Sequence, residues 1–366
     1  MLAIFSEVNS SPQLFSILMA AKENGILVDV LIFSVKENPL LRELRNNGIN
    51  ARNIRPRQKI NSVVLFLTVA FKIFRQKPDI LFTSGIYANI VGLTTSYFQK
   101  VKRRVFIRHH SNFHSINRHF FGIFTDRLCN RLATDIVAVS KLVEQILVKN
   151  EKVSQKKVSL IHNGINLSVF KHDRKKVRVF NDPDSELQFR IGMVSRMTKL
   201  KGISYAAEAF VKLHEEFPHA TFTVIGQFSD SYTDIKQTLE KLPPSSYQLM
   251  ESTPSVSNFL SSLDAFIHVP IGIEDESFGL VYLEALASNV ECIFTVSGIL
   301  NELPNLEKYV SLVDYKSAHG IYQALHRLLE NLDNNMLVVP EIWLSQFDLE
   351  QMSKKYVDLF VEKERS

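Results

Sequence analysis

The sequence has few of the residues that build disulfide-linked or zinc-bound modules. Its 366 residues include only two cysteines, Cys129 and Cys292, which excludes a disulfide framework and a cysteine-rich zinc module. This usage is typical of a reducing, cytoplasmic compartment. Apolar runs are short as well, because residues 63–71 fall far below the ~20 residues that a membrane-spanning helix needs. Residues 1–6 predict a first strand and not a secretion signal, so we expect a soluble cytoplasmic protein.

Charge is unevenly divided along the chain. Residues 1–170 contain 24 Lys and Arg against 10 Asp and Glu, a net charge of +14, whereas the remainder contains 19 against 28, a net charge of −9. The basic residues of the first half form three groups: Arg52, Arg55, Arg57 and Lys59; Lys72, Arg75 and Lys77; and Lys102, Arg103 and Arg104. Such groups fit a nucleic-acid surface, an anionic membrane surface or solvated helix faces. Nucleic acid is disfavoured, because no recognisable motif interleaves these cations with aromatic residues.

Short apolar runs alternate with helical patterns in both halves, which predicts parallel sheets built from βαβ units. The expected strands are 2–6, 27–33, 80–83, 105–107, 135–140, 158–162, 189–194, 221–225, 265–269, 292–295 and 310–313. The expected helices include 13–22, 61–76, 117–132, 141–149, 203–217, 256–263, 280–288, 319–331 and 349–364. A hydrophobic fraction of 45% is enough to bury real cores. The sequence therefore predicts two doubly wound α/β domains.

The expected division is a basic N-terminal domain over residues 1–172, a C-terminal domain over 173–345 and a final segment, 346–366. The polar stretch 171–188 lacks an apolar period and is predicted as the interdomain linker. The last helix follows the second domain and is free to pack elsewhere. Doubly wound sheets bind ligands at the carboxyl ends of their strands, which predicts a ligand cleft between the two domains.

Two acidic residues flank a Phe-Gly pair in the most informative stretch of the second half. Glu276 precedes Phe278-Gly279, where a helix is predicted to begin, and Glu284, eight positions after Glu276, is expected about two turns into that helix on a similar face. The N–H groups of a helix N-terminus bind anions, and a glycine lets a phosphate approach closely. Ionised carboxylates accept hydrogen bonds from neighbouring hydroxyls. Each glutamate alone is as easily an ordinary helix residue, but the combination indicates a site for a phosphorylated, hydroxylated ligand.

Two cations follow the first predicted strand of the second domain. Arg196 and Lys201 lie between this strand and the helix that begins after Gly202. A guanidinium and an ammonium at a strand-to-helix turn suit a diphosphate, although structural salt bridges are an equally good interpretation.

These residues resemble the retaining glycosyltransferases of family 4, which have the GT-B fold. The resemblance rests on Arg196 and Lys201-Gly202 followed by Glu276-x7-Glu284, and it extends over residues 77–300. Supporting matches are Lys77-Pro-Asp, Val137-Ala-Val-Ser140, His162-Asn-Gly and Leu263-Asp264. The final helix, near Trp343 and Tyr356, is also similar to the family helix that returns to the N-terminal domain.

The resemblance implies a role for each matching residue. Arg196 and Lys201 would hold the donor diphosphate and stabilise it as it departs, Glu276 would contact the donor sugar, and Glu284 would bind the ribose hydroxyls. The residues implied beside the phosphates are Phe278, Gly279 and Leu280.

A histidine in the N-terminal domain is also implied near the reacting sugar. His109 and His110 follow a predicted strand, and either fits this role, with a preference for His110. Zinc binding by these two residues with His114 is disfavoured, because the spacing matches no helical zinc motif. Asp182-Pro-Asp184 lies in the predicted linker and is expected to form a turn, so a metal-independent enzyme is expected.

The implied function is retaining transfer of a hexose from a UDP- or GDP-sugar to a glycan or lipid-linked acceptor, in cell-surface polysaccharide or lipopolysaccharide biosynthesis. The enzyme would need no cofactor and would act at the cytoplasmic face of an anionic membrane. A nucleotide-sugar epimerase of related fold, or a non-catalytic basic protein that binds membranes or nucleic acid, are the alternatives.

Overall fold

The computed structural model describes residues 1–34, 38–54, 62–111, 120–171, 188–330 and 339–362. The chain forms two compact units, each described by itself below. Unit 1 comprises residues 1–165 with 347–366, and unit 2 comprises residues 166–346. The sequence analysis places the divisions close by, at 172/173 and 345/346. The predicted linker 171–188 lies almost wholly outside the described residues, as do His114, Asp182 and Asp184.

Unit 1 is built on a seven-stranded parallel sheet with the order β3-β2-β1-β4-β5-β6-β7. The strands are β1 (Leu2–Ser6), β2 (Asp29–Phe33), β3 (Asn50–Ile54), β4 (Ile80–Ser84), β5 (Arg103–Arg108), β6 (Asp135–Ala138) and β7 (Val158–Leu160). The interior strand β1 is buried along its whole length, because both faces of a parallel sheet carry helices. The chain reverses its direction across the sheet at β1, the arrangement of a doubly wound fold.

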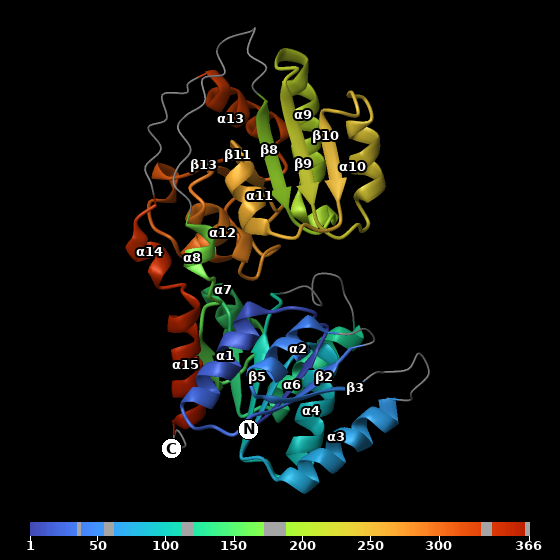
Figure 1. Cartoon of the computed structure of the whole chain (residues 1–366), viewed down its shortest axis with the longest axis vertical. Helices are drawn as coiled ribbons and strands as arrows, with labels where there is room; N and C mark the ends of the chain where they lie inside the picture. The colour runs from blue at the N-terminus through green and yellow to red at the C-terminus, as the bar shows by residue number, and fades with distance from the viewer. Residues whose placement is uncertain (35–37, 55–61, 112–119, 172–187, 331–338, 363–366) are drawn as a thin grey trace. The chain divides into compact units, whose positions relative to one another are not determined.

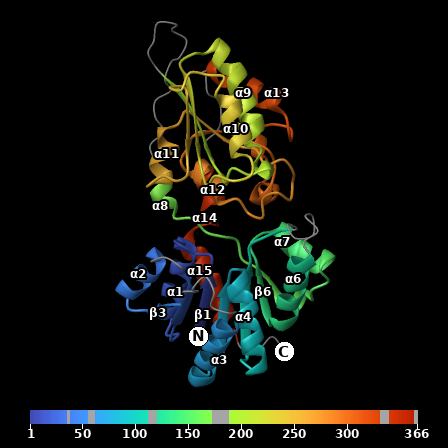
Figure 2. The ribbon, with the colours of Figure 1, turned by 90° about the vertical axis from the view of Figure 1, so that its right-hand side faces the viewer.

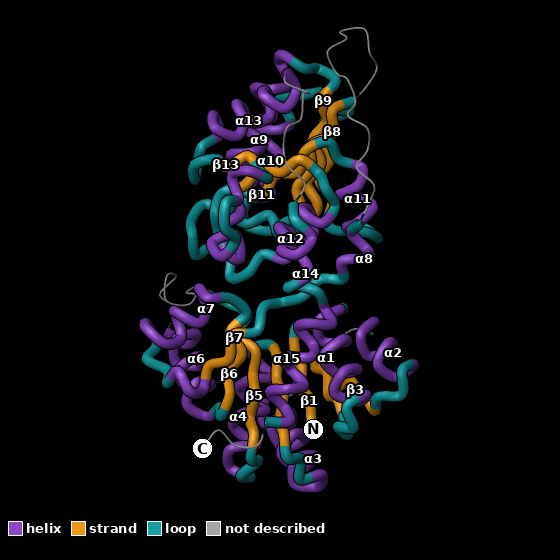
Figure 3. Tube along the Cα trace, turned by 90° about the vertical axis from the view of Figure 1, so that its left-hand side faces the viewer, coloured by secondary structure: helices purple, strands orange, loops and turns teal. Residues whose placement is uncertain are grey.

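Helices cover both faces of this sheet (Figure 3). They are α1 (Pro12–Glu23), α2 (Pro39–Asn46), α3 (Ser62–Gln76), α4 (Ile86–Phe98), α6 (Phe120–Leu132), α7 (Lys141–Gln145) and the C-terminal α15 (Leu349–Val361). A π-helical turn (Ile146–Asn150) continues α7 to the end of the predicted helix 141–149. The helix α15 packs beside α1, although the two are far apart in sequence (Figure 1). Its Tyr356 and Phe360 rings contact Phe82 of β4, with centroids 5.8 and 5.3 Å away.

Unit 2 contains a six-stranded parallel sheet with the order β10-β9-β8-β11-β12-β13. The strands are β8 (Phe189–Val194), β9 (Ala220–Ile225), β10 (Tyr247–Met250), β11 (Ala265–His268), β12 (Glu291–Phe294) and β13 (Ser311–Leu312). The helices are α8 (Leu167–Phe170), α9 (Ile203–Glu216), α10 (Tyr232–Leu239), α11 (Val256–Ser262), α12 (Leu280–Ala287), α13 (Ala318–Glu330) and α14 (Glu341–Ser345). The two sheets confirm the predicted fold class of two Rossmann-like α/β domains. The strands β8 and β11 are parallel neighbours, so the loop with Arg196 and Lys201 and the loop with Glu276 leave the same edge of the sheet.

Candidate active site

The loop after β8 carries the two predicted phosphate-binding cations. It ends in a short 3₁₀ turn (Lys199–Lys201) before Gly202, whose φ of +67° lies in the left-handed region. A Cβ on Gly202 would come within 2.0 Å of the Val269 carbonyl oxygen, so only glycine allows this turn. Arg196 is exposed at the end of β8, and its side chain makes no hydrogen bond or ion pair with any residue that the structure describes. Its guanidinium is therefore available to a ligand.

Glu276 lies between β11 and α12 and is the centre of a charged cluster. Its Oε1 accepts from the Lys201 ammonium, in an ion pair, and from Nε2 of His268 at 2.9 Å. Its backbone N–H donates to Ser297 Oγ at 3.2 Å, which fixes the loop. Burial by itself would raise the pKa of Glu276, but the bond from His268 and the charge of Lys201 outweigh it and hold the pKa at about 2. Glu276 is thus a carboxylate at any physiological pH.

The other carboxylate oxygen of Glu276 is not engaged by this cluster. Among the described residues, Oε2 has no hydrogen-bond donor, and 15% of the side-chain surface remains exposed. An ionised carboxylate in this position can accept a hydrogen bond from a ligand hydroxyl without breaking its bonds to Lys201 and His268. Oε2 of Glu276 is therefore positioned to accept a hydrogen bond from a hydroxyl group of a ligand.

His268 ends strand β11 and is almost completely buried. Its ring packs edge-to-face against Tyr282, with centroids 4.7 Å apart. Desolvation lowers the pKa of His268, and the bond to Glu276 only partly offsets this effect. The ring is therefore neutral, and its contact with the carboxylate assigns the hydrogen to Nε2. Nδ1 has no hydrogen-bond partner among the described residues. Within that part of the chain, the polar contact of the ring is the bond from Nε2 to Glu276.

The N-terminus of α12 follows directly after Glu276. Gly279 has a φ of +79°, and a Cβ there would lie 2.5 Å from the Tyr282 ring. Gly279 occupies the N-cap position and has no side chain with which to cap the helix, whose first residue is Leu280. Phe278 is buried, and its carbonyl accepts from the Ile299 N–H at 2.8 Å. The backbone N–H groups of this first turn thus follow a half-buried glycine, an arrangement that suits an anion.

Glu284 lies one turn inside α12. Burial raises its pKa to about 7, and its carboxylate makes no hydrogen bond with any described residue. The two predicted glutamates therefore differ, because Glu276 is held in its charged form whereas Glu284 changes its charge near neutral pH.

In unit 1, the two candidate histidines lie just beyond the carboxyl end of β5. His109 Nε2 lies 3.0 Å from Ser84 Oγ of the neighbouring β4. His109 is exposed, but desolvation by the protein atoms around its ring, and then the neighbouring His110, lower its pKa below the usual value. His109 is therefore neutral at physiological pH.

His110 is held by a carboxylate that the sequence does not predict. Its Nε2 lies 3.1 and 3.2 Å from the two carboxylate oxygens of Asp126 on α6. Asp126 also forms an ion pair with the buried Arg108 at 3.2 Å, and Arg108 in turn bonds Glu151 at 2.5 Å. The Arg108 Nε also donates to the His110 carbonyl at 3.1 Å. The His110 imidazole is thus fixed in orientation while 30% of its surface stays exposed.

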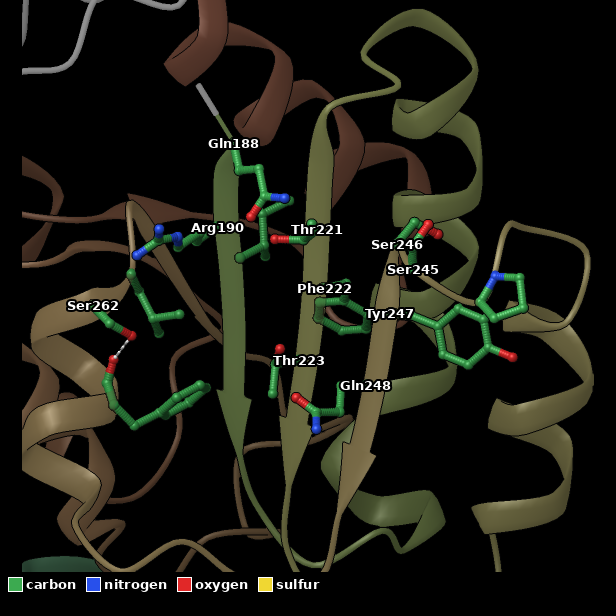
Figure 4. Close-up of a pocket in the computed structure, with 14 residues that line it drawn as sticks. Gln188, Arg190, Thr221, Phe222, Thr223, Ser245, Ser246, Tyr247, Gln248 and Ser262 are labelled. Carbon is green, nitrogen blue, oxygen red and sulfur yellow. Dashed lines mark hydrogen bonds between the residues drawn. The ribbon is translucent and has the colours of Figure 1, made fainter. Parts of the chain in front are cut away.

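A separate polar hollow in unit 2 lies away from these residues (Figure 4). It measures about 440 Å³ and lies over the first residues of β8 and β9, with Arg190, Thr221 and Gln248 in its lining. Ligands of doubly wound sheets bind at the opposite, carboxyl ends of the strands. The hollow is therefore not the predicted donor site.

The structure brings Lys201 and Glu276 into contact and places Phe278, Gly279 and Leu280 directly after them, with Arg196 on the same loop as Lys201. His268, Ser297 and Asp126 were not predicted from the sequence, although a lone histidine in the apolar run 265–269 was a visible signal. Each unit has its own candidate residues, and the predicted cleft between the domains stays a prediction. No group of three or more potential metal ligands occurs among the described residues.

The two parallel sheets define a protein with two Rossmann-like α/β domains, and comparisons with known proteins specify its class. The model described as Glycosyltransferase Family 4 matches residues 14–169, and that described as Glycosyl transferases group 1 matches residues 188–331. Together they cover most of both units. The chain belongs to the glycosyltransferases of family 4, also called group 1, with the GT-B fold.

Individual relatives agree with this assignment. The chain is 22% identical over 282 residues to the capsular polysaccharide biosynthesis glycosyltransferase CapM of Staphylococcus aureus, covering 71% of this chain and 69% of CapM. Its fold matches that of Anabaena HepE, solved with UDP and glucose, at a TM-score of 0.77 and 15% identity over 99% of both chains. WaaG, a glycosyltransferase involved in lipopolysaccharide biosynthesis, matches at a TM-score of 0.70 and 14% identity over 99% of this chain and 100% of that one.

Proposed function

We propose that this glycosyltransferase moves a hexose from a UDP- or GDP-sugar to a glycan or lipid-linked acceptor, in the biosynthesis of a cell-surface polysaccharide or lipopolysaccharide. The capsular role in the name of CapM supports the product class, and HepE, which has been solved with UDP-glucose, supports the donor class. The observation that carries the proposal is the cluster of Lys201, Glu276 and His268 beside the uncapped N-terminus of α12.

In the proposed donor complex, unit 2 binds the nucleotide sugar at several points. Oε2 of Glu276 accepts from a sugar hydroxyl, while Lys201 and His268 hold the carboxylate in place. The diphosphate lies between Arg196, Lys201 and the N–H groups after Gly279, and Glu284 accepts from the ribose hydroxyls. The sugar is thereby fixed relative to its leaving group before reaction.

The proposed reaction breaks the bond between the sugar carbon C1 and the diphosphate oxygen, and the electron pair leaves with the diphosphate. Arg196, Lys201 and the helix N-terminus stabilise the charge that develops on that oxygen. The acceptor hydroxyl bonds to C1 on the same face, with retention of configuration, and its proton passes to the departing phosphate. His110, oriented by Asp126, contacts the sugar from unit 1. We propose that the reaction needs no metal ion.

We further propose that the acceptor is presented at the cytoplasmic face of a membrane. No described helix combines the length and the apolar character needed to cross a bilayer. The net charge of +14 over residues 1–170 supports peripheral attraction to anionic lipids.

Thermal shifts with a panel of UDP- and GDP-sugars test the donor, because a ligand raises the melting temperature according to its affinity. We expect one nucleotide class to stabilise the parent protein and not the Arg196→Ala variant.

NMR of the product should show the anomeric configuration of the donor, and EDTA should leave the rate unchanged. An inverted product would contradict the retaining mechanism, and loss of rate in EDTA would contradict metal independence.

A further inference from the structure

Helix α3 of unit 1 has apolar side chains both on its buried face and on a face that is exposed to solvent. Val69 and Ile73 are buried and form its inner face. A second stripe, Leu67, Phe71 and Phe74, recurs at helical spacing on another face and is exposed, with 68% of Phe74 open to solvent. A helix that is apolar over this much of its surface is normally covered on both faces.

The neighbouring helix α4 ends in two further exposed aromatic residues. The helices α3 and α4 pack side by side (Figure 2), and the Gln99 side chain after α4 donates to the Ala70 carbonyl of α3 at 2.9 Å. Tyr97 and Phe98, the last two residues of α4, are also exposed, and the Arg104 guanidinium lies over the Tyr97 ring. Phe98 is 74% exposed, and its ring packs edge-to-face on Tyr97. We call the five residues the α3–α4 surface: Leu67, Phe71, Phe74, Tyr97 and Phe98.

Exposed cations lie at the C-terminal ends of α3 and α4, next in sequence to residues of the α3–α4 surface. Arg75, Lys77, Lys100 and Lys102 are exposed, and none forms an ion pair with a residue that the structure describes. Between residues 44 and 125 the sequence has a single acidic residue, Asp79. An apolar surface bordered by uncompensated cations matches a boundary where acyl chains lie beneath anionic headgroups.

We propose that the α3–α4 surface inserts into the interface of an anionic membrane, with α3 parallel to the bilayer plane. The inference deepens the proposed membrane association by assigning it to named residues. With 15 residues, α3 is too short to span a bilayer, but its apolar stripe suits an interfacial helix. A second copy of the chain is a poorer occupant, because a two-fold contact would bring the same cations of both copies together.

Flotation with vesicles tests this assignment. The full chain should bind vesicles of phosphatidylcholine with phosphatidylglycerol and bind pure phosphatidylcholine far less. The Phe71→Ser/Phe74→Ser variant should lose about tenfold or more in partitioning, because its rings no longer enter the interface. The Lys100→Gln/Lys102→Gln variant should lose about thirtyfold at low salt, since each cation strengthens binding about fivefold near an anionic surface.

Matched variants in unit 2 control for general effects. Ile342→Ser removes another exposed apolar residue, Lys241→Gln/Lys308→Gln removes two exposed cations, and both should bind vesicles like the parent. Thermal stabilisation by nucleotide sugar reports the donor site separately and should be equal in all variants.

Equal partitioning of parent and α3–α4 variants would overturn the proposal, as would a parent dimer that the Phe71→Ser/Phe74→Ser variant abolishes. A parent that binds donor but no vesicles would refute the membrane surface and leave the transferase function intact. A parent that binds vesicles but no donor would refute the transferase function and leave the membrane surface intact.

Discussion

Both units hold a carboxylate between a cation and a histidine, but they expose different members of the set. In unit 2 the histidine is buried, with His268 only 1% exposed, and the Glu276 carboxylate keeps an oxygen for a ligand. In unit 1 the cation is buried, with Arg108 only 2% exposed, and the His110 imidazole reaches solvent. The comparison shows how one polar combination can present a fixed acceptor of hydrogen bonds in one domain and an oriented imidazole in the other.

The largest effect is expected at the cation of unit 2. Lys201→Ala removes both the charge that would face the diphosphate and the ion pair to Glu276, so kcat should fall about 10²–10³-fold. Lys199→Ala changes an exposed lysine of the same turn and should retain parent activity in steady-state assays. Similar rates for the two variants would remove Lys201 from the mechanism.

The buried histidine of unit 2 is the next most sensitive position. His268→Leu deletes the bond that helps to hold the pKa of Glu276 at about 2, so burial should raise that pKa and kcat should fall about tenfold. The acid limb of the pH–rate profile should move to higher pH. His268→Gln, whose amide can still donate, should shift it less. A purely packing role would lower activity without moving the profile.

Glu284 predicts a pH dependence of donor binding. Its pKa is raised to about 7, so its carboxylate is mostly protonated at pH 6 and mostly ionised at pH 8. Donor affinity should therefore be about tenfold weaker at pH 6 than at pH 8 by calorimetry, and nearly constant in Glu284→Gln.

The same shift makes a prediction for stability. A carboxyl group whose pKa is higher in the folded chain than in the unfolded chain destabilises the fold once pH exceeds the unfolded value near 4.5. Glu284→Gln should therefore melt at a higher temperature than the parent at pH 8 and at a similar temperature at pH 4. Equal melting temperatures at pH 8 would mean that the ionised carboxylate carries no such cost.

The smallest effect is expected when the Asp126 carboxylate that orients the His110 imidazole is removed. Asp126→Asn retains the shape but weakens the contact that orients the imidazole, so kcat should fall several-fold with little change in donor KM. His110→Gln should have at least the same effect, and His109→Gln a smaller one. If His109→Gln caused the larger loss, the assignment of the two histidines would be reversed.

The sequence was informative where a strand is buried on both faces or where a motif adjoins a strand end. Leu2–Ser6 and Phe189–Val194 match their predicted limits because their apolar runs end at polar turns. The edge strand Asn50–Ile54 was not predicted, because its alternate residues face solvent and it carries no apolar run.

The candidate site was partly predictable for a similar reason. Lys201 and Glu276 follow neighbouring parallel strands, β8 and β11, so their approach follows from topology. The role of His268 depends on the path of the loop to Glu276, and a histidine in an apolar strand resembles an ordinary core residue. Asp126 reaches His110 from α6, 16 residues away, and only the packed fold shows that contact.

Calorimetric titration of the full chain with UDP and GDP tests the central claim most directly, in the parent and in the Arg196→Ala and Lys199→Ala variants. One of the two nucleotides should bind the parent and Lys199→Ala equally and bind Arg196→Ala at least tenfold more weakly. Equal affinity in all three proteins, or no binding of either nucleotide to the parent, would contradict it.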